Sequence, residues 1–271
     1  MTQKAPTLYD DLNTILADFA SSVQQILKDN FVGVYLQGSF ATGGVDQNSD
    51  VDFIVITERE LSSHEVATLQ TMHRRIFEYN ILWAKHLEGS YVPKAIFAQY
   101  DDCSAPLWYL DNGSRTFEQS THCNTIIVRT VIRDLSITLA GQPAHEVVVP
   151  VPVTVLRQYI ADDMREWGAE ILDNPDRFAN QFYQVFILEN YCRMLHDFTR
   201  GIPGSKPEGT TRAKSHLDAR WHNLIDRTLQ TRKNNSLSGI DPADPQDFQE
   251  TLEFVQYAIQ KLEDYKHLLA E

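Results

Sequence analysis

The stretch LQGSFATGGVDQNSDVDFIVI, residues 36–56, places a Gly-Ser pair ahead of two aspartates. Asp50 and Asp52 stand at the start of VDFIVIT, which is rich in β-branched residues and predicts a strand over 51–57. Side chains at positions i and i+2 of a strand point to the same face, with Cα atoms roughly 6.5 to 7 Å apart. The two carboxylates can therefore converge on one hard cation.

Two aspartates at this spacing also occur in solvated turns, so the residues before them decide the interpretation. Gly38 allows the backbone to approach a ligand closely, and Ser39 at a helix start offers a hydroxyl beside unpaired N–H groups. Mg²⁺ usually binds through one or two carboxylates together with substrate phosphates and water. The combination indicates nucleotide chemistry, in which a substrate hydroxyl attacks a phosphorus atom in line and the metal bridges phosphates.

The pattern around this stretch predicts alternating helices and strands. Apolar residues at steps of three and four predict a helix over 8–28, and a short helix is expected after Gly38. Ser62 is the expected N-cap of the next helix. Strands are predicted over 31–37, 51–57, 86–92 and, as an edge strand, 136–141, and further helices over 62–80 and 124–134.

The pattern of apolar residues changes where two prolines interrupt VVVPVPV, residues 147–153. Beyond Pro152 the spacing is helical over 153–172, 176–200, 207–232 in two pieces, and 244–270, with a polar loop over 234–245. We therefore expect an α+β fold, with a small mixed-sheet domain over 1–152 followed by an all-α helical bundle over 153–271.

The charge balance bears on the class of partner. The 37 acidic residues exceed the 24 basic ones, for a formal net charge of −13 and a pI near 5.1. Non-specific affinity for nucleic acid comes mainly from Lys and Arg, so no nucleic-acid partner is expected. A small cationic substrate would be attracted to this surface, although solubility accounts for the charge equally well.

Other sequence features exclude several classes of protein. No segment approaches the ~18 to 20 uninterrupted apolar residues of a membrane span, and the amino terminus does not resemble a signal peptide, so the expected location is the cytoplasm. The cysteines Cys103, Cys123 and Cys192 form no C-x-x-C pair, which argues against disulfides or a thiolate metal site.

Four segments carry a resemblance to known proteins. GSFATGGVDQNSDVDFIV, residues 38–55, resembles the G-S, variable linker, S-D-x-D signature of the polymerase-β-like nucleotidyltransferase superfamily. LEGSYV, NTIIVRTVIRDLSITLAG and NYCRMLHDFTRGIPGSK, which begin at residues 87, 124 and 190, resemble the aminoglycoside adenylyltransferases that modify streptomycin and spectinomycin. The similarity covers nearly the whole chain in the same order.

The resemblance implies a reaction and a set of site residues. The reaction is Mg²⁺-dependent transfer of AMP from ATP to a hydroxyl of a small cationic acceptor, bound between the two domains of a monomer. Asp50 and Asp52 would hold Mg²⁺, and Glu88 would be the catalytic base, a role that a carboxylate on the third strand could also reach geometrically. The nucleotide would be contacted by Gly38, Ser39, Ser49, Asn124, Arg193, Lys206 and Arg232.

Some of these positions depart from the relatives. Asn124 replaces an acidic residue, and Arg232 replaces an aromatic residue that often lies near the nucleotide. Asn174, Ala179 and Tyr183 stand where streptomycin modifiers have a tryptophan and two acidic residues. Nearby Trp167, Asp173 and Asp176 could replace some of that stacking and charge.

These departures leave the acceptor open. It could be an aminoglycoside, another small molecule or a protein side chain. A nucleotidyltransferase that works mainly by binding a partner protein, as an antitoxin does, is a further alternative, because a fold does not fix a function.

Overall fold

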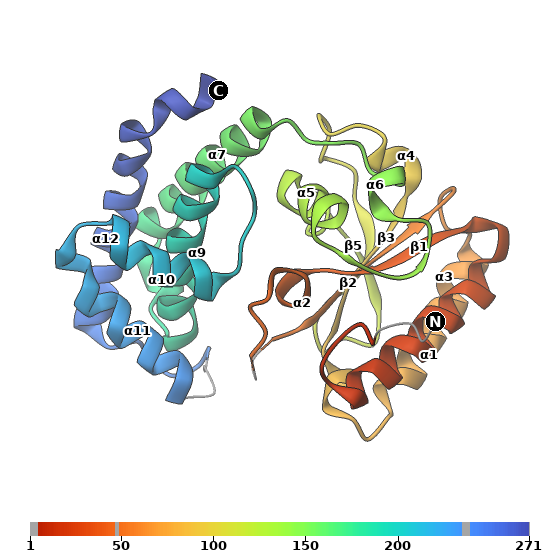
Figure 1. The fold of residues 1–271 in the computed structure, drawn as a ribbon. Helices are drawn as coiled ribbons and strands as arrows, with labels where there is room; N and C mark the ends of the chain where they lie inside the picture. The colour runs from red at the N-terminus through yellow and green to blue at the C-terminus, as the bar shows by residue number, and fades with distance from the viewer. Residues whose placement is uncertain (1–4, 47–48, 235–238, 271) are drawn as a thin grey trace. The chain divides into compact units, whose positions relative to one another are not determined.

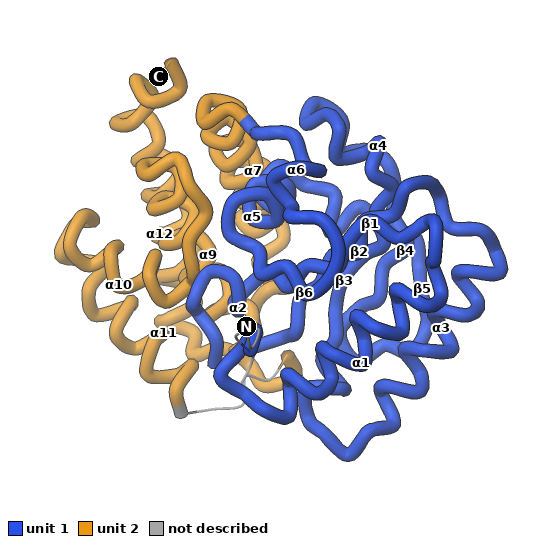
Figure 2. The backbone as a smooth tube through the Cα atoms, turned by 45° about the vertical axis from the view of Figure 1, so that its right-hand side comes forward, with its two compact units in different colours: residues 1–151 blue, residues 152–271 orange. Residues whose placement is uncertain are grey.

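The computed structural model describes residues 5–46, 49–234 and 239–270 (Figure 1). The chain divides into two compact units, Met1–Val151 and Pro152–Glu271, called unit 1 and unit 2 below (Figure 2). The division falls at the proline-containing segment that interrupts the sequence pattern.

Unit 1 is built on one six-stranded mixed sheet with the order β5-β4-β3-β2-β1-β6. Only β2 and β3 pair in parallel, and the other neighbours pair antiparallel. The strands are β1 (Phe31–Leu36), β2 (Val51–Thr57), β3 (Leu87–Pro93), β4 (Leu107–Leu110), β5 (Phe117–Ser120) and β6 (Ile137–Gly141). The predictions for β1, β2, β3 and β6 are confirmed, whereas β4 and β5 were not predicted.

Helices cover both faces of this sheet. α1 and α3 pack side by side on one face (Figure 1), and residues of α5 and α6 contribute to the core on the other. The serine predicted to cap α3 does so, because Ser62 Oγ accepts a hydrogen bond from Glu65 N. The helices are α1 (Asp10–Leu27), α2 (Gly38–Thr42), α3 (Ser63–Phe77), α4 (Lys94–Phe97), α5 (Ile126–Asp134) and α6 (Ala144–Val147).

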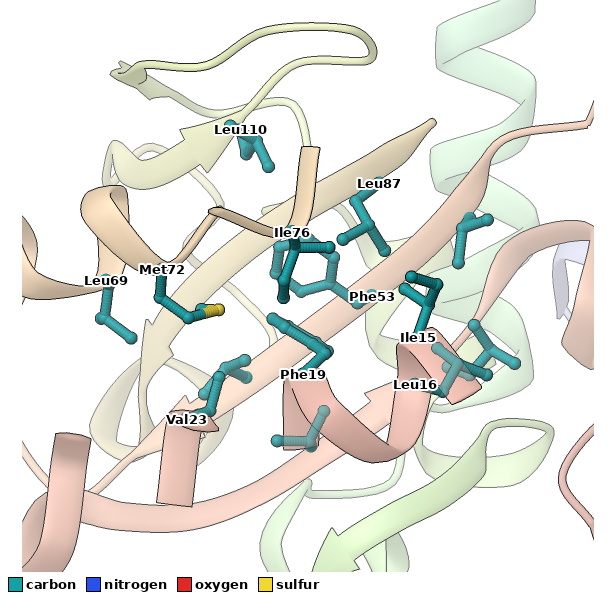
Figure 3. Close-up of a cluster of buried hydrophobic side chains, with 14 of the residues drawn as sticks. Ile15, Leu16, Phe19, Val23, Phe53, Leu69, Met72, Ile76, Leu87 and Leu110 are labelled. Atoms are coloured by element: carbon teal, nitrogen blue, oxygen red, sulfur yellow. The ribbon is translucent and has the colours of Figure 1, made fainter. Parts of the chain in front are cut away.

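The alternation along β2 explains how the sheet is held in place. Phe53 packs with Phe19 of α1 and Ile76 of α3 in one core cluster, as Figure 3 shows. The next residue, Ile54, belongs to the cluster on the opposite face together with Ile132 of α5. Because β2 is buried on both faces, the position of its first residues, including Asp52, is fixed by the core.

Within the part of the chain that the structure describes, the regular elements of unit 2 are all helices, so the predicted α+β fold class is confirmed. α9 packs against α7, α10, α11 and α12. The helices are α7 (Val153–Asp173), α8 (Pro175–Phe178), α9 (Gln181–Arg200), α10 (Lys206–His216), α11 (His222–Asn234) and α12 (Pro245–Asp264). No helix among the described residues is long and apolar enough to cross a membrane.

Two boundaries in unit 2 differ from the prediction. The helix predicted over 176–200 is divided into α8 and α9, because Asn180 is extended, caps α9 by accepting from Tyr183 N at 2.9 Å, and pairs with Pro242 in an isolated β-bridge. The last predicted helix ends at Asp264 and is followed by a 3₁₀ turn over Lys266–Ala270. Of the predicted loop over 234–245, residues 235–238 lie outside the described residues.

Candidate active site

The predicted carboxylates lie at one edge of the sheet in unit 1. Asp52 is the second residue of β2 and pairs in register with Glu88, the second residue of β3. Paired residues on adjacent strands point to the same face and are about 4.8 Å apart along the sheet. Asp50 precedes the same strand and accepts a hydrogen bond from Asn112 Nδ2 at 2.5 Å. The structure therefore brings together three acids from two separate parts of the sequence.

Gly38 lies directly beside Asp52, and Ser39 follows it in α2. Gly38 has a positive φ of 58°, and a Cβ added to it would stand 1.9 Å from Asp52 Oδ2. Only glycine allows this approach of backbone to carboxylate. Ser39 Oγ is buried and makes no hydrogen bond within the described residues. An unpaired buried hydroxyl on the residue after the glycine that packs on Asp52 has the chemistry to bind a phosphate oxygen or a metal-bound water.

Ser49 has local partners. Asp46 N donates to Ser49 Oγ at 2.8 Å, and Ser49 N donates to Asp46 O at 3.1 Å. The residues between them, 47 and 48, lie outside the described residues. These contacts give Ser49 a role in closing the loop before the aspartates, and the nucleotide contact expected of it stays a prediction.

The acids and Ser39 suit a divalent cation that is only partly ligated by protein. No group of three or more His, Cys, Asp or Glu side chains within the described residues forms a metal site of its own. Mg²⁺ needs fewer protein ligands, since phosphate and water oxygens usually complete its octahedron. Asp50 and Asp52 are therefore a donor set that fits Mg²⁺ bound together with a nucleotide.

Glu88 is surrounded by residues that sequence reasoning missed. Tyr109 Oη donates to Glu88 Oε1 at 2.5 Å, and His122 Nε2 lies 3.4 Å from the same oxygen. The Tyr109 hydroxyl is also 3.1 Å from Asp111 Oδ1. Burial, followed by the hydrogen bond to Glu88, raises the pKa of Tyr109 well above its ordinary value, so this hydroxyl remains a donor.

Asn124 is part of the scaffold of unit 1. It is buried, with Nδ2 donating to Ala105 O at 2.8 Å and Oδ1 accepting from Arg129 Nη2 at 2.6 Å. Arg129 is itself buried and also donates to backbone carbonyls, including Asp102 O. The Asn124 side chain thus holds the turn between β5 and α5, and its contact with a nucleotide stays a prediction.

The predicted cations of unit 2 gather on one face of α9. Phe186, Glu189 and Arg193 follow the spacing i, i+3, i+7, which places them on the same side of a helix. Lys206 Nζ, from the first turn of α10, lies 4.5 Å from the centre of the Phe186 ring. Arg232 of α11 donates to Glu189 Oε2 at 2.8 Å. Residues from three helices are therefore assembled around this face.

Close packing fixes α10 beside Arg193. A Cβ on Gly209 of α10 would meet Arg193 Cα at 2.4 Å, so the two helix backbones touch at this point. Arg193 Nη2 donates to Asn190 Oδ1 at 2.7 Å on the same face of α9. Glycine at position 209 is what allows Lys206 and Arg193 to be presented by adjacent helices.

Trp167 is engaged in the packing of unit 2. Its ring stacks on Tyr191 with a centroid distance of 5.5 Å and meets Phe186 edge-on at 5.9 Å. Tyr183 lies in the first turn of α9, while Asp176 is exposed on α8. These positions define no acceptor site, and the replacement of drug-contacting residues by Trp167, Asp173 or Asp176 stays a hypothesis.

A cavity of about 240 Å³ lies elsewhere on α9. Cys192, Leu195 and His196 of α9 line it together with residues of α10 and with Tyr265. None of the predicted site residues is among its lining, so this cavity is separate from the face that carries Arg193.

Comparison with known proteins finds a match in each half of the chain. Residues 21–87 match the family model described as polymerase beta, nucleotidyltransferase, and residues 146–261 match that of the aminoglycoside adenylyltransferase C-terminal domain. No curated protein matches the chain.

A solved structure has the same fold. The spectinomycin adenyltransferase AAD(9) from Enterococcus faecialis, whose crystal structure contains ATP and spectinomycin, superposes with a TM-score of 0.69 at 15% identity, covering 91% of this chain and 98% of that chain.

The first match contains the segment with Gly38, Ser39 and the two aspartates, and it defines the class of the protein as a nucleotidyltransferase. The second match places an aminoglycoside adenylyltransferase C-terminal domain over residues 146–261, and the AAD(9) structure has the same fold. The resemblance that the sequence motifs indicated is thereby confirmed.

Proposed function

We propose that this enzyme transfers AMP from Mg²⁺-bound ATP to a hydroxyl of an aminoglycoside-type antibiotic of the streptomycin and spectinomycin kind. The observation that carries the proposal is the register pairing of Asp52 with Glu88, beside Asp50 and the glycine that packs on Asp52. This arrangement sets two candidate metal ligands next to a candidate base on one face of the sheet.

In the proposed reaction the acceptor oxygen bonds to the α-phosphorus of ATP as the bond to the bridging oxygen breaks and pyrophosphate leaves. Glu88 accepts the proton of the acceptor hydroxyl. Asp50 and Asp52 hold Mg²⁺, which when bound offsets the charge on the phosphate oxygens. Gly38 and Ser39 position the phosphates, and the buried Ser39 hydroxyl supports that role.

Unit 2 supplies the cations of the proposed site. Arg193 and Lys206 bind the triphosphate and support the leaving pyrophosphate, as charge-assisted hydrogen bonds to phosphate do. Their presentation by adjacent helices, fixed by the packing of Gly209 on Arg193, supports this assignment. Arg232 is held by Glu189 on the same face of α9, where it would contact the nucleotide. We further propose that the enzyme acts as a monomer and does not bind nucleic acid.

The acceptor class rests on the family match and on charge. The match to the aminoglycoside adenylyltransferase C-terminal domain covers 146–261, and the chain carries a net charge of −13, which favours a cationic acceptor. The AAD(9) structure contains spectinomycin, so that compound is a natural first choice for the assay.

Pyrophosphate release tests the proposal. Purified protein is incubated with ATP and Mg²⁺ and, in parallel, with streptomycin, spectinomycin, other aminoglycosides and a mixed metabolite extract. We expect release with streptomycin or spectinomycin, and a much lower but measurable rate when Glu88→Gln replaces the wild-type protein. Release only with the metabolite extract would show another acceptor, and no release with any acceptor would refute the transferase function.

A further inference from the structure

Two side chains of unit 1 reach the proposed base from elements distant in sequence. Tyr109 comes from β4, which pairs antiparallel with β3 so that Tyr109 lies opposite Ser90. Glu88 is two residues before Ser90 on β3, and side chains on this diagonal are within reach of an aromatic residue. The hydroxyl of Tyr109 accordingly meets Glu88 Oε1 at 2.5 Å.

The direction of this hydrogen bond follows from the number of protons. A tyrosine hydroxyl has one proton, and Tyr109 faces two carboxylate oxygens, Glu88 Oε1 at 2.5 Å and Asp111 Oδ1 at 3.1 Å. The shorter contact takes the proton, since a charge-assisted O–H···O⁻ bond has that length. Tyr109 is only 4% exposed, so its ring cannot turn away from Glu88 without disturbing the core.

His122 approaches the same oxygen from another direction. It follows β5, and its backbone N donates to Ser120 Oγ at 3.1 Å. Its ring lies 5.2 Å from that of Tyr109, with Nε2 3.4 Å from Glu88 Oε1. The hydrogen bond to Glu88 raises the pKa of His122 above its ordinary value, with Asp52 and Asp111 adding to this effect. Glu88 Oε1 is thus contacted by two donors carried on different elements.

We propose that Tyr109 and His122 are positioning residues, which hold Oε1 of Glu88 and thereby fix the rotamer of its carboxylate beside Asp52. This inference rests on the proposed role of Glu88 as the base. A glutamate side chain has several rotamers, and a general base is effective only when its oxygen stays within hydrogen-bonding reach of the proton. Two donors on one carboxylate oxygen restrict those rotamers before any substrate binds.

Site-directed variants test this role. Tyr109→Phe removes the hydroxyl and retains the ring, and His122→Ala removes the imidazole. We expect each to lower kcat by about 10-fold, with KM for ATP changed less than about 2-fold. His122→Gln retains a side-chain donor and should recover part of the lost kcat. In a Glu88→Gln background, Tyr109→Phe should have little further effect, because its action passes through Glu88.

Matched controls separate positioning from stability. Tyr79 Oη donates to Asp18 Oδ2 at 2.7 Å, so Tyr79→Phe removes the same type of hydrogen bond elsewhere in unit 1, and His64→Ala removes an exposed imidazole. Both controls should keep wild-type kcat.

Two results would contradict the proposals, one for the inference alone and one for the proposed function as well. Wild-type kcat in Tyr109→Phe and His122→Ala, with Glu88→Gln impaired, would overturn this inference alone. Absence of pyrophosphate release from the wild-type protein would overturn the proposed function and the inference with it.

Discussion

One residue close to Arg193 of the proposed phosphate site, Asp197, has a buried carboxylate with a raised pKa. Asp197 of α9 is 3% exposed and accepts a hydrogen bond from Gly204 N at 2.8 Å. Burial is the largest cause that raises its pKa to about 7, while the nearby Arg193 opposes the shift. The pKa of an unfolded aspartate is about 3.9, so the folded protein binds a proton at Asp197 that the unfolded chain has lost.

This raised pKa makes the free energy of unfolding depend on pH. Between about pH 4 and pH 7 this group makes the free energy of unfolding fall as pH rises, because the native state binds more protons there. Asp197→Asn removes the titration and retains the shape, so its stability relative to wild type should increase from pH 5 to pH 8, by about 1 to 3 kcal/mol. Urea unfolding at both pH values measures this, with the exposed Asp176→Asn as control. A constant difference between Asp197→Asn and wild type would contradict the assignment.

Two glycines of the α2 region provide a matched pair. Gly38 has φ 58° and packs on Asp52, whereas Gly43 has φ 79° and nothing within 4 Å of an added Cβ. Gly38→Ala should displace the Asp52 carboxylate and lower the rate of pyrophosphate release by about 100-fold. Gly43→Ala should lower stability by about 1 kcal/mol and leave the rate unchanged. Equal rates in the two variants would show that the contact between Gly38 and Asp52 does not matter for function.

The sequence predicts site residues best where they lie close together along the chain. Gly38, Ser39, Asp50 and Asp52 lie within one short segment, so their spacing alone predicts a common site. Glu88 needed the family resemblance, since one acid among 37 has no distinguishing local pattern. Tyr109 and His122 could not be found, because their contact with Glu88 depends on a strand pairing that no local signal indicates.

Among the elements, predictability follows length and period. β1, β2, β3 and β6 have five to seven residues and were predicted, whereas β4 and β5 have four residues each and were not. A four-residue strand has too few positions for an alternating pattern to stand out. The break before α9 was missed for another reason, since Asn180 pairs with Pro242, which is far away in sequence.

The face of α9 depends on a buried ion pair between helices. Glu189 is 0% exposed, and Arg232 of α11 donates to its Oε2 at 2.8 Å. Arg232→Met leaves the carboxylate buried without this partner and should lower the free energy of unfolding by about 3 kcal/mol.

The double variant Arg232→Met, Glu189→Gln tests the pairing and should recover part of that loss. Arg177→Met breaks the exposed pair with Glu170 and should change the free energy by less than about 1 kcal/mol. Chemical denaturation of the four proteins provides the comparison. A loss in Arg232→Met as small as in Arg177→Met would refute the structural role of the pair.

For the whole molecule, the change of sequence pattern at Pro152 was sufficient to predict an α+β fold, because strand patterns end before this residue and only helical patterns follow it. The pattern of helical and strand periods does not predict which acceptor the enzyme uses. The positions that differ from streptomycin modifiers, Asn174, Ala179 and Tyr183, lie at helix ends, and no local pattern at these positions indicates which acceptor binds.

The net charge of −13 predicts that kcat/KM depends on ionic strength. If the acidic surface attracts a cationic acceptor, raising the ionic strength from about 0.02 M to about 0.2 M should lower kcat/KM for streptomycin several-fold, with kcat unchanged. Steady-state rates at saturating ATP provide the measurement. A salt-independent kcat/KM would show that the charge acts on solubility alone.

We propose that adenylyl transfer by this enzyme depends on Asp50 and Asp52. Transfer of labelled AMP from α-labelled ATP to streptomycin or spectinomycin tests it most directly, in wild type, in Asp52→Asn and in the exposed control Asp134→Asn. We expect labelled acceptor from wild type and the control, and a rate at least about 1000-fold lower from Asp52→Asn. A wild-type rate of transfer by Asp52→Asn would contradict it.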